Sequence, residues 1–312
     1  MLRITPHLWF DKEARDAAEL YTSVIPNSKI TNVTTLHNTP SGDCDIVSFE
    51  LSGQPFMAIS AGPLFKFNPS VSFHAKCKTK SEVDAIFEKL SEGGKVFMPL
   101  GHYPFSDRYG WLEDKYGLSW QVFLIGDREM RQRITPVLMF VGGVCGKTEE
   151  AVNFYTEVFR NVPASAEGST NASILARYGK GEEPDRDGTV RYASFKLLGQ
   201  EFGAMDSARE HKFAFNEAIS FIVSCDMQRE IDYLWERLSA DPKAEQCGWL
   251  KDRYGLSWQI TPTIMNEMLS SNDKGTTARV TQALLKMKKF DIDALKRAYE
   301  GDNSMGLPPR RP

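Results

Sequence analysis

Apolar and polar residues alternate along residues 4–10, where Trp9 adds a large aromatic side chain, and this alternation predicts a β-strand. Residues 12–23 instead repeat their apolar positions every three or four residues, which is the pattern of a helix with one buried side. Pro26 and Asn27 are expected to end that helix. Three more strands are predicted near residues 29–37, 44–51 and 54–60.

The same order of elements begins again near residue 70. Residues 70–77 are predicted to form a strand, and residues 81–92 a helix with Ser81 as its N-cap and Gly93 as its terminator. Short strands follow near residues 95–98, 109–113 and 118–125. The order of the elements is therefore βαβββ, repeated, which predicts an α+β fold.

Two stretches of the sequence are nearly identical. Residues 110–122 read GWLEDKYGLSWQV and residues 248–260 read GWLKDRYGLSWQI, so ten of 13 positions are the same. Shorter pairs keep the same order, such as FNPSVSF at 67–73 and FNEAISF at 215–221. The chain is therefore a tandem duplication, and each copy contains the βαβββ pattern twice.

The two copies differ in length just before the GWL motif. Leu90 and Gly110 are 20 residues apart, whereas the equivalent Leu238 and Gly248 are 10 apart. We therefore expect the second copy to lack one arm of a hairpin that the first copy keeps.

The strand pattern stops after residue 263. Two amphipathic helices are predicted there, at 279–288 and at 292–299, the second capped by Asp291. We expect this tail to be a helical cover that packs on the domains or on a second subunit. The predicted boundaries are 1–128 for the first domain, 129–264 for the second, 265–303 for the helical tail and 304–312 for a flexible terminus.

The composition narrows the class of protein. Hydrophobic residues make up 41% and charged residues 25% of the 312 residues, as in globular proteins. The net charge is −3 with no basic stripe, and no apolar run approaches the roughly 18 residues of a membrane span, so neither nucleic acid nor a membrane is expected as a partner. No signal peptide is evident at the N-terminus. The five cysteines form no CxxC pair, which favours reduced thiols in the cytoplasm.

Several residues recur in both copies, and recurrence favours a role in the fold. Trp120 alternates with Gln121, so it is expected to pack under the helices if Gln121 faces the other way. Asp114 lies in a turn before Gly117, which explains it without any chemistry. Cys77 ends a strand before a helix, where it is either a reactive thiolate or, more commonly, a buried structural thiol.

The phrases ITPHLWFDKEARDAAELYTSVIPNSKI, GQPFMAI, FNPSVSF and CGWLKDRYGLSWQI resemble the PhnB-like group, which is also described as demethylubiquinone-methyltransferase-like. This group is a branch of the vicinal oxygen chelate superfamily, which includes glyoxalases and bleomycin-resistance proteins. The resemblance covers residues 3–300 and implies tandem glyoxalase-like domains. Each domain would consist of two βαβββ modules that form an open cup, and a C-terminal helical tail would follow.

The resemblance also implies where a site lies, because ligands in this superfamily point into the cup from the first and last strands of each module. In the first copy these positions correspond to Thr5 or His7, Ser60, Ser72 or His74, and Gln121. The ligand-binding cup is expected to include all of these residues together with Trp9 and Phe123. In the second copy the same positions correspond to Thr135 or Val137, Met205 or Asp206, Ser220 or Ile222, and Gln259.

A divalent metal ion is the usual cofactor of the superfamily, held by His and Glu. Gln121 stands where relatives have a Gly-x-x-x-Glu ending, and His7, His74 and Gln121 are the candidate ligands in the first copy. Each histidine is either such a ligand, a general base, or a polar residue that only binds substrate or water. The second copy offers almost nothing to a metal.

Three functions remain open. The first is the binding of a small organic molecule in the cup of the first domain, with the second copy largely structural. The second is a metal-dependent lyase, isomerase or dioxygenase, and the third is a non-catalytic structural or interaction module. A carboxylate that reaches the cup favours the enzyme, whereas aromatic residues such as Trp9 and Phe123 favour the binding protein. The resemblance also implies a homodimer, although the fused repeat offers the same pairing within one chain.

Overall fold

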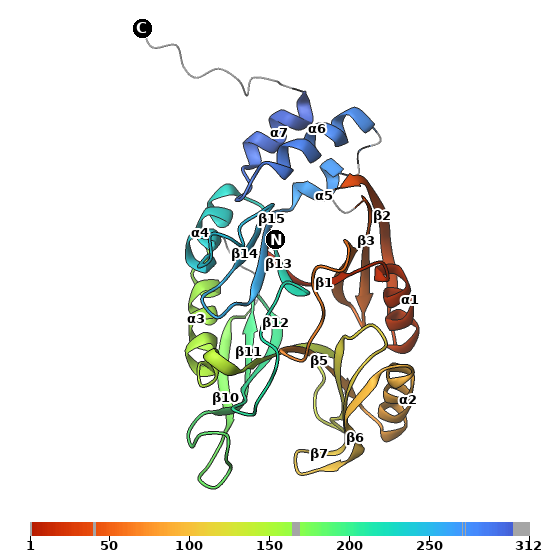
Figure 1. Cartoon of the computed structure of the whole chain (residues 1–312), viewed down its shortest axis with the longest axis vertical. Coiled ribbons are helices and arrows are strands. Elements are labelled where there is room, and N and C mark those ends of the chain that lie inside the picture. The colour runs from red at the N-terminus through yellow and green to blue at the C-terminus, as the bar shows by residue number, and fades with distance from the viewer. Residues whose placement is uncertain (1, 40–41, 164–168, 270, 272, 302–312) are drawn as a thin grey trace. The chain divides into compact units, whose positions relative to one another are not determined.

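A computed structural model describes residues 2–39, 42–163, 169–269, 271 and 273–301 (Figure 1). The chain divides into two compact units. The larger unit consists of Thr5–Arg160 and Gly168–Phe221, and the smaller of Met1–Ile4, Asn161–Glu167 and Ile222–Pro312. The predicted flexible terminus at 304–312 lies outside the described residues.

The first module has the predicted βαβββ order. Its elements are β1 (Arg3–Phe10), α1 (Ala14–Val24), β2 (Lys29–Thr39), β3 (Gly42–Leu51) and β4 (Gln54–Ser60). The strands lie in the order β2-β3-β4-β1, and β1 runs parallel to β4. Ser52 and Gly53 form the turn between β3 and β4 with φ of 48° and 78°, because positive φ at both positions matches the twist of a tight hairpin.

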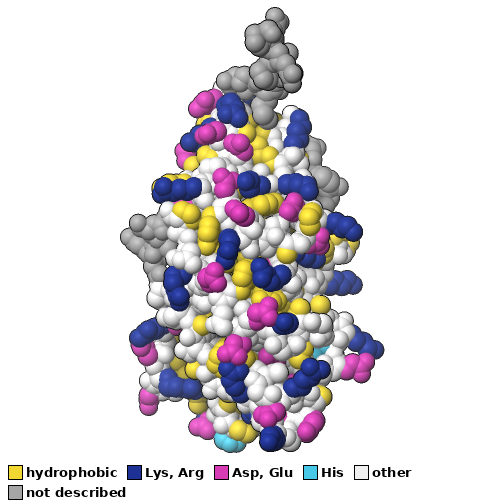
Figure 2. All heavy atoms as spheres, turned by 90° about the vertical axis from the view of Figure 1, so that its left-hand side faces the viewer, with side chains coloured by type: hydrophobic (Ala, Val, Ile, Leu, Met, Phe, Trp, Pro, Cys, Tyr) yellow, Lys and Arg dark blue, Asp and Glu magenta, His cyan; other side chains and the backbone are white. Residues whose placement is uncertain are grey.

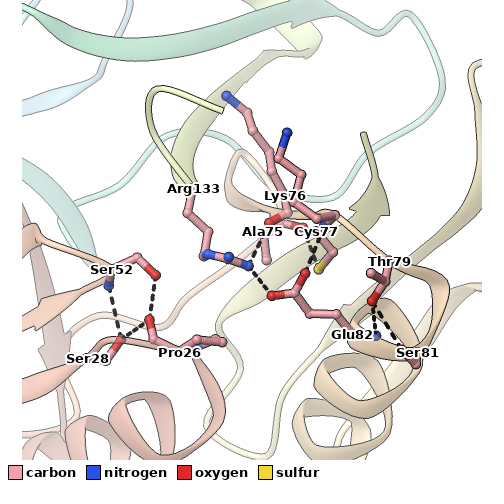
Figure 3. A network of polar contacts seen from close by, with 11 residues as sticks. Pro26, Ser28, Ser52, Ala75, Lys76, Cys77, Thr79, Ser81, Glu82 and Arg133 are labelled. Carbon is pink, nitrogen blue, oxygen red and sulfur yellow. Dashed lines mark hydrogen bonds and ion pairs between the residues drawn. The ribbon is translucent and has the colours of Figure 1, made fainter. Parts of the chain in front are cut away.

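The second module repeats this order with a longer hairpin than predicted. Its elements are β5 (Val71–Cys77), α2 (Lys80–Ser91), β6 (Lys95–Tyr103), β7 (Ser106–Glu113) and β8 (Ser119–Leu124). The prediction that Ser81 caps α2 is wrong. The N-cap is Thr79, whose side chain accepts a hydrogen bond from the backbone N–H of Glu82 (Figure 3).

The second copy contains the same modules. The third module has β9 (Ile134–Phe140), a short 3-10 turn (Gly142–Val144), α3 (Thr148–Arg160), β10 (Asn171–Arg177), β11 (Val190–Leu197) and β12 (Gln200–Asp206). The fourth has β13 (Ile219–Cys225), α4 (Gln228–Leu238), β14 (Trp249–Lys251) and β15 (Ser257–Pro262). Only the three-residue β14 stands where the first copy has the hairpin β6–β7, so the predicted loss of a hairpin arm is confirmed.

One mixed sheet of eight strands lies wholly in the larger unit. Its strand order is β10-β11-β12-β9-β5-β8-β7-β6. The second module of the first copy therefore joins the first module of the second copy, through the antiparallel pair β5–β9. The fold class is as predicted, but this sheet is built from both copies and not from one.

Equivalent residues of the two copies stabilise this exchange by bonding reciprocally. Asn68 donates from its amide to the carbonyl of Ala214 (3.0 Å), and Asn216 donates to the carbonyl of Lys66 (2.8 Å). Both asparagines belong to the repeated FN motif that precedes β5 and β13. Each asparagine thus bonds to the backbone of the other copy just before a strand begins. These bonds help to hold β5 and β13 beside strands of the other copy.

A charged contact fixes the same junction on the helix side. Arg133, just before β9, donates to Glu82 of α2 at 2.5 Å and to the carbonyl of Lys76 at 3.1 Å (Figure 3). The Arg133 side chain is 12% exposed and the Glu82 side chain 21%, so water screens the pair little.

The duplicated GWL motif forms a hydrogen-bonded turn in each copy. One carboxylate oxygen of Asp114 accepts from the backbone N–H of Tyr116 (2.8 Å) and Leu118 (3.1 Å), and the other accepts from the indole N–H of Trp120 (2.9 Å). Asp252 makes the equivalent bonds in the second copy. Trp120 is fully buried. The predictions of a turn role for the aspartate and a core position for the tryptophan are therefore confirmed.

The tail packs within the smaller unit, where β14, β15 and β13 are neighbours in that order. It contains α5 (Ile264–Leu269), α6 (Lys274–Leu285) and α7 (Ile292–Glu300), and Asp291 caps α7 as predicted. The backbone N–H groups of Cys247 and Gly248 donate to the carbonyls of Met287 (2.8 Å) and Lys288 (2.7 Å). The equivalent segment of the first copy belongs to β7, which pairs with β6. The tail thus bonds where the second copy lacks its hairpin arm.

Charge is mixed on the surface drawn in Figure 2, where basic and acidic side chains are interleaved without a large area of one sign. Among the helices of the described residues, none combines the length and the apolar character that a membrane crossing requires.

Candidate functional site

One side of the eight-stranded sheet gathers polar and aromatic side chains from both copies. We call it the His74 face. Strand pairing places His74 of β5 beside Gln121 of β8 on one side and Thr135 of β9 on the other. Because alternate residues of a strand share a face, the following residues also belong to it: Ser72, Lys76, Tyr109, Phe123, Val137, Tyr192, Lys196, Glu201 and Gly203.

Gln121 is the centre of a buried hydrogen-bond cluster on this face. Its amide oxygen accepts from the hydroxyl of Tyr109 at 2.8 Å and lies 3.2 Å from Nε2 of His74. Its amide nitrogen donates to the hydroxyl of Ser72 at 2.8 Å. These bonds use both ends of the amide and hold it in one orientation.

Burial keeps the His74 imidazole neutral, and its contact with Gln121 involves one ring nitrogen. In the tautomer that carries its proton on Nε2, the ring donates to this amide oxygen and Nδ1 is an acceptor. Burial, and to a smaller extent the charge of Lys76, lowers the pKa of His74 to about 3, although the bond to Gln121 opposes the shift. The imidazole is therefore neutral near pH 7.

Within the part of the chain that the structure describes, Nδ1 of His74 and the hydroxyl oxygen of Thr135 are buried polar atoms of this face without a hydrogen-bond partner. His74 is 7% exposed and Thr135 is 2% exposed, and the two residues are directly opposite in the β5–β9 pair. A buried polar atom without a partner costs about 1–3 kcal/mol. Nδ1 of His74 and the Thr135 hydroxyl thus belong to neighbouring residues, and one bound molecule could form hydrogen bonds with both.

Two aromatic rings contact the His74 imidazole. The ring of Tyr192 stacks on His74 with centroids 5.8 Å apart, and Phe123 meets His74 edge-on at 4.9 Å. Tyr192 reaches this place because Gly203 has no side chain. A Cβ there would lie 2.8 Å from the Tyr192 hydroxyl and 3.1 Å from Val137. Tyr192 and Phe123 are both half-buried, so the floor of the face is buried and its rim is partly open.

The hairpin β6–β7 adds a further group of rings. Tyr103 and Phe105 near its tip each contact Tyr109, with centroids 5.3 Å and 4.9 Å apart, and Phe105 is 61% exposed. A hollow of about 360 Å³ lies at this tip and is lined in part by Phe105, Leu124 and Arg128. Since Tyr109 donates to Gln121, the hairpin is linked directly to the buried cluster.

The predicted site residues are only partly brought together. Ser72, His74, Gln121 and Phe123 lie on the His74 face. Thr5, His7 and Trp9 lie on β1, which belongs to a different sheet. There His7 is buried opposite the hydroxyl of Ser220 at 3.5 Å, and burial lowers its pKa to about 3. The two histidines therefore do not face a common ion on one sheet.

Ser60 requires a correction. It pairs with Phe10 and not with His7 along β4, so it lies on the opposite side of the strand. Its hydroxyl accepts from the backbone N–H of Ala14 at the start of α1. Asp206, at the equivalent position of the second copy, likewise accepts from Thr148 at the start of α3. Both side chains accept hydrogen bonds from the start of a helix.

Three residues of the site were not predicted: Tyr109, Tyr192 and Gly203. Tyr109 could have been found by alternation, because it lies two residues before Trp111, the strand partner of Gln121. Tyr192 and Gly203 could not, because they belong to the second copy, and only the exchange of modules brings them to His74.

The donor set on the His74 face does not suit a divalent metal ion. Among the described residues there is no group of three or more His, Cys, Asp or Glu side chains that could hold one. The groups beside His74 in the sheet are a carboxamide and a hydroxyl, which bind Zn²⁺ or Fe²⁺ weakly. Glu201 is a carboxylate of this face, but both its oxygens are engaged by Lys76 and Lys196. The prediction of a metal held by His7, His74 and Gln121 thus finds no support in the geometry.

The chain is an α+β protein with a tandem glyoxalase-like fold. Residues 2–123 and 132–261 match the family model described as 3-demethylubiquinone-9 3-methyltransferase, and the chain belongs to this family. Glyoxalase I from Zea mays is 9% identical over 87% of this chain and 98% of its own, with a TM-score of 0.52, so it shares the fold.

Two single-copy relatives cover about one repeat each. A PhnB protein from Bacillus cereus, described as a candidate 3-demethylubiquinone-9 3-methyltransferase, is 40% identical over 38% of this chain and 97% of its own, with a TM-score of 0.37. The protein PA1353 from Pseudomonas aeruginosa is 23% identical over 39% and 96%, with a TM-score of 0.35. No match was found among curated proteins.

Proposed function

We propose that the protein binds a small organic molecule on the His74 face. The observation that supports this most directly is the pair of buried, unpartnered atoms on His74 and Thr135. A molecule that donates to Nδ1 and accepts from the Thr135 hydroxyl removes the cost of both. The rings of Tyr192 and Phe123 supply apolar contact beside these polar groups, which is the usual composition of a ligand site.

Binding fits the site better than acid–base chemistry does. A general base works best when its pKa is near the operating pH, whereas the pKa of His74 is lowered to about 3. Nδ1 is therefore a hydrogen-bond acceptor and a weak base. No carboxylate joins the hydrogen-bond cluster around Gln121 among the bonds of the described residues.

The family description names methyl transfer, but the sequence has no Gly-rich loop after its first strand to bind a nucleotide-like methyl donor. Residues 11–13, which follow β1, contain no glycine. A Gly-rich turn after the first strand is the usual way in which α/β folds hold such a cofactor. We therefore place ligand binding ahead of methyl transfer.

A ligand-observed NMR screen with small aromatic molecules, each carrying an N–H or O–H donor, tests the proposal. We expect hits whose binding is lost in His74→Phe and weakened in Thr135→Val. His102→Phe is the matched control, because His102 is exposed on the hairpin. If the hits bind equally well to the His74, Thr135 and His102 variants, the ligand site lies elsewhere and the proposal is wrong.

A further inference from the structure

Two lysines and one glutamate form an ion cluster beside His74. Lys76 Nζ lies 2.9 Å from one carboxylate oxygen of Glu201, and Lys196 Nζ lies 3.5 Å from the other. The side chains of the three residues are only 16–19% exposed. Burial raises the pKa of Glu201, but the two ammonium groups outweigh burial and leave that pKa below its ordinary value.

The two lysines of this cluster have more N–H donors than Glu201 has oxygens to accept them. Both oxygens of Glu201 are engaged, whereas an ammonium group carries three N–H donors. Two positive charges face one negative charge, so the formal charge of the cluster is +1. One carboxylate of a ligand would balance it. The cluster would repel a cation. It would neutralise only one of the two negative charges of a phosphate dianion.

The cluster is on the same side of the sheet as the unpartnered atoms. Lys76 lies two residues after His74 on β5, so the two side chains leave the same face of the strand, with their Cα atoms about 6.6 Å apart. In Figure 3 the Lys76 side chain leaves β5 on the side away from the Arg133–Glu82 ion pair. Lys196 and Tyr192 lie on the same face of β11, and Tyr192 stacks on His74.

We propose that the ligand of the His74 face is a small aromatic monocarboxylic acid with a hydroxyl or N–H group at the far end of its ring. Its carboxylate binds Lys76 and Lys196. Its ring lies against Tyr192 and Phe123, and its donor bonds to Nδ1 of His74. This proposal rests on the proposed function and specifies the chemistry of its ligand.

Three matched probes test the assignment by isothermal titration calorimetry. They are 4-hydroxyphenylacetate, 4-hydroxyphenylacetamide, which lacks the charge, and phenylacetate, which lacks the donor. We expect the hydroxy acid to bind at least tenfold more tightly than either analogue, with an affinity that falls as salt rises. The comparison of probes on the wild-type protein needs no variant and so does not depend on folding.

Variants assign each end of the ligand. Lys76→Met should abolish the preference for the acid over the amide, and His74→Phe should abolish the preference for the hydroxylated acid. Lys89→Met is the control, because Lys89 forms an exposed ion pair with Glu92 on α2. Equal binding of acid and amide overturns this inference, as does the absence of binding by all three probes. If neutral molecules then still bind and need His74 to do so, the proposed function stands without the aromatic acid. If no molecule binds in this way, the proposed function and the aromatic-acid inference are both wrong.

Discussion

Replacing Thr135 by valine should make the protein more stable and a poorer binder. The Thr135 hydroxyl is buried without a partner, so the free protein bears the cost of removing it from water. Valine has nearly the same shape and no polar group, and the substitution should raise the free energy of unfolding by about 1–2 kcal/mol. Ligand binding should weaken, because the ligand loses one hydrogen bond. Stability traded against function in this way is common at binding sites.

Thr148→Val is the matched control. Thr148 is equally buried, but its hydroxyl donates to Asp206 at 2.8 Å. Losing a bond to a charged group should lower the free energy of unfolding by about 1.5–3 kcal/mol. Urea unfolding followed by circular dichroism at pH 7 measures both changes, provided that the slope against urea is unchanged. If Thr135→Val destabilises the protein as Thr148→Val does, the Thr135 hydroxyl has a partner and the reasoning fails.

Three further predictions concern His74, the cysteines and the two turn aspartates. Because the folded-state pKa of His74 is about 3 and the unfolded value is 6.5, only the unfolded state takes up this proton between those values, so the stability from His74 is complete above pH 6.5 and is lost as pH falls, by about 3 kcal/mol at pH 4.5. His74→Gln should remove this part of the dependence in urea titrations at several pH values, while His7, whose pKa burial also lowers to about 3, keeps its own part. A thiol reagent should modify Cys145 and Cys247, the two half-buried cysteines, in the native protein, and the remaining three only after unfolding; a count of five in the native state contradicts the structure. Asp114→Asn and Asp252→Asn should each lower the free energy of unfolding by about 1.5–3 kcal/mol in denaturant titrations, because the amide turns a donor towards the indole N–H; a neutral effect rules out the turn as described.

Much of the local structure follows from the sequence because it depends on neighbours along the chain. Alternation correctly placed Trp120 in the core and Gln121 on the opposite face. The aspartate before the Gly-containing turn was recognised as structural for the same reason. Ser81 was mistaken for the N-cap because Thr79 offers the same hydroxyl two residues earlier, and the local pattern does not distinguish them.

The pairing of modules could not be predicted, because it depends on long-range contacts. β5 has the same hydrophobic pattern whichever module lies beside it, and a sheet formed within one copy satisfies that pattern equally well. The signal for exchange is the reciprocal bonding of Asn68 and Asn216, which is recognisable only in three dimensions. As a result, His7 and His74 were predicted to share a cup, whereas His74 faces Thr135 of the other copy.

The exchange of modules within a single chain also removes a constraint of symmetry. In a homodimer of single repeats, a substitution that builds a binding group on one face appears on the other face as well. Here each position occurs once, and the residue equivalent to His74 in the second copy is Ile222. Substitutions can therefore adapt the His74 face to a ligand without altering the equivalent positions of the other copy. Those positions are then constrained only by packing.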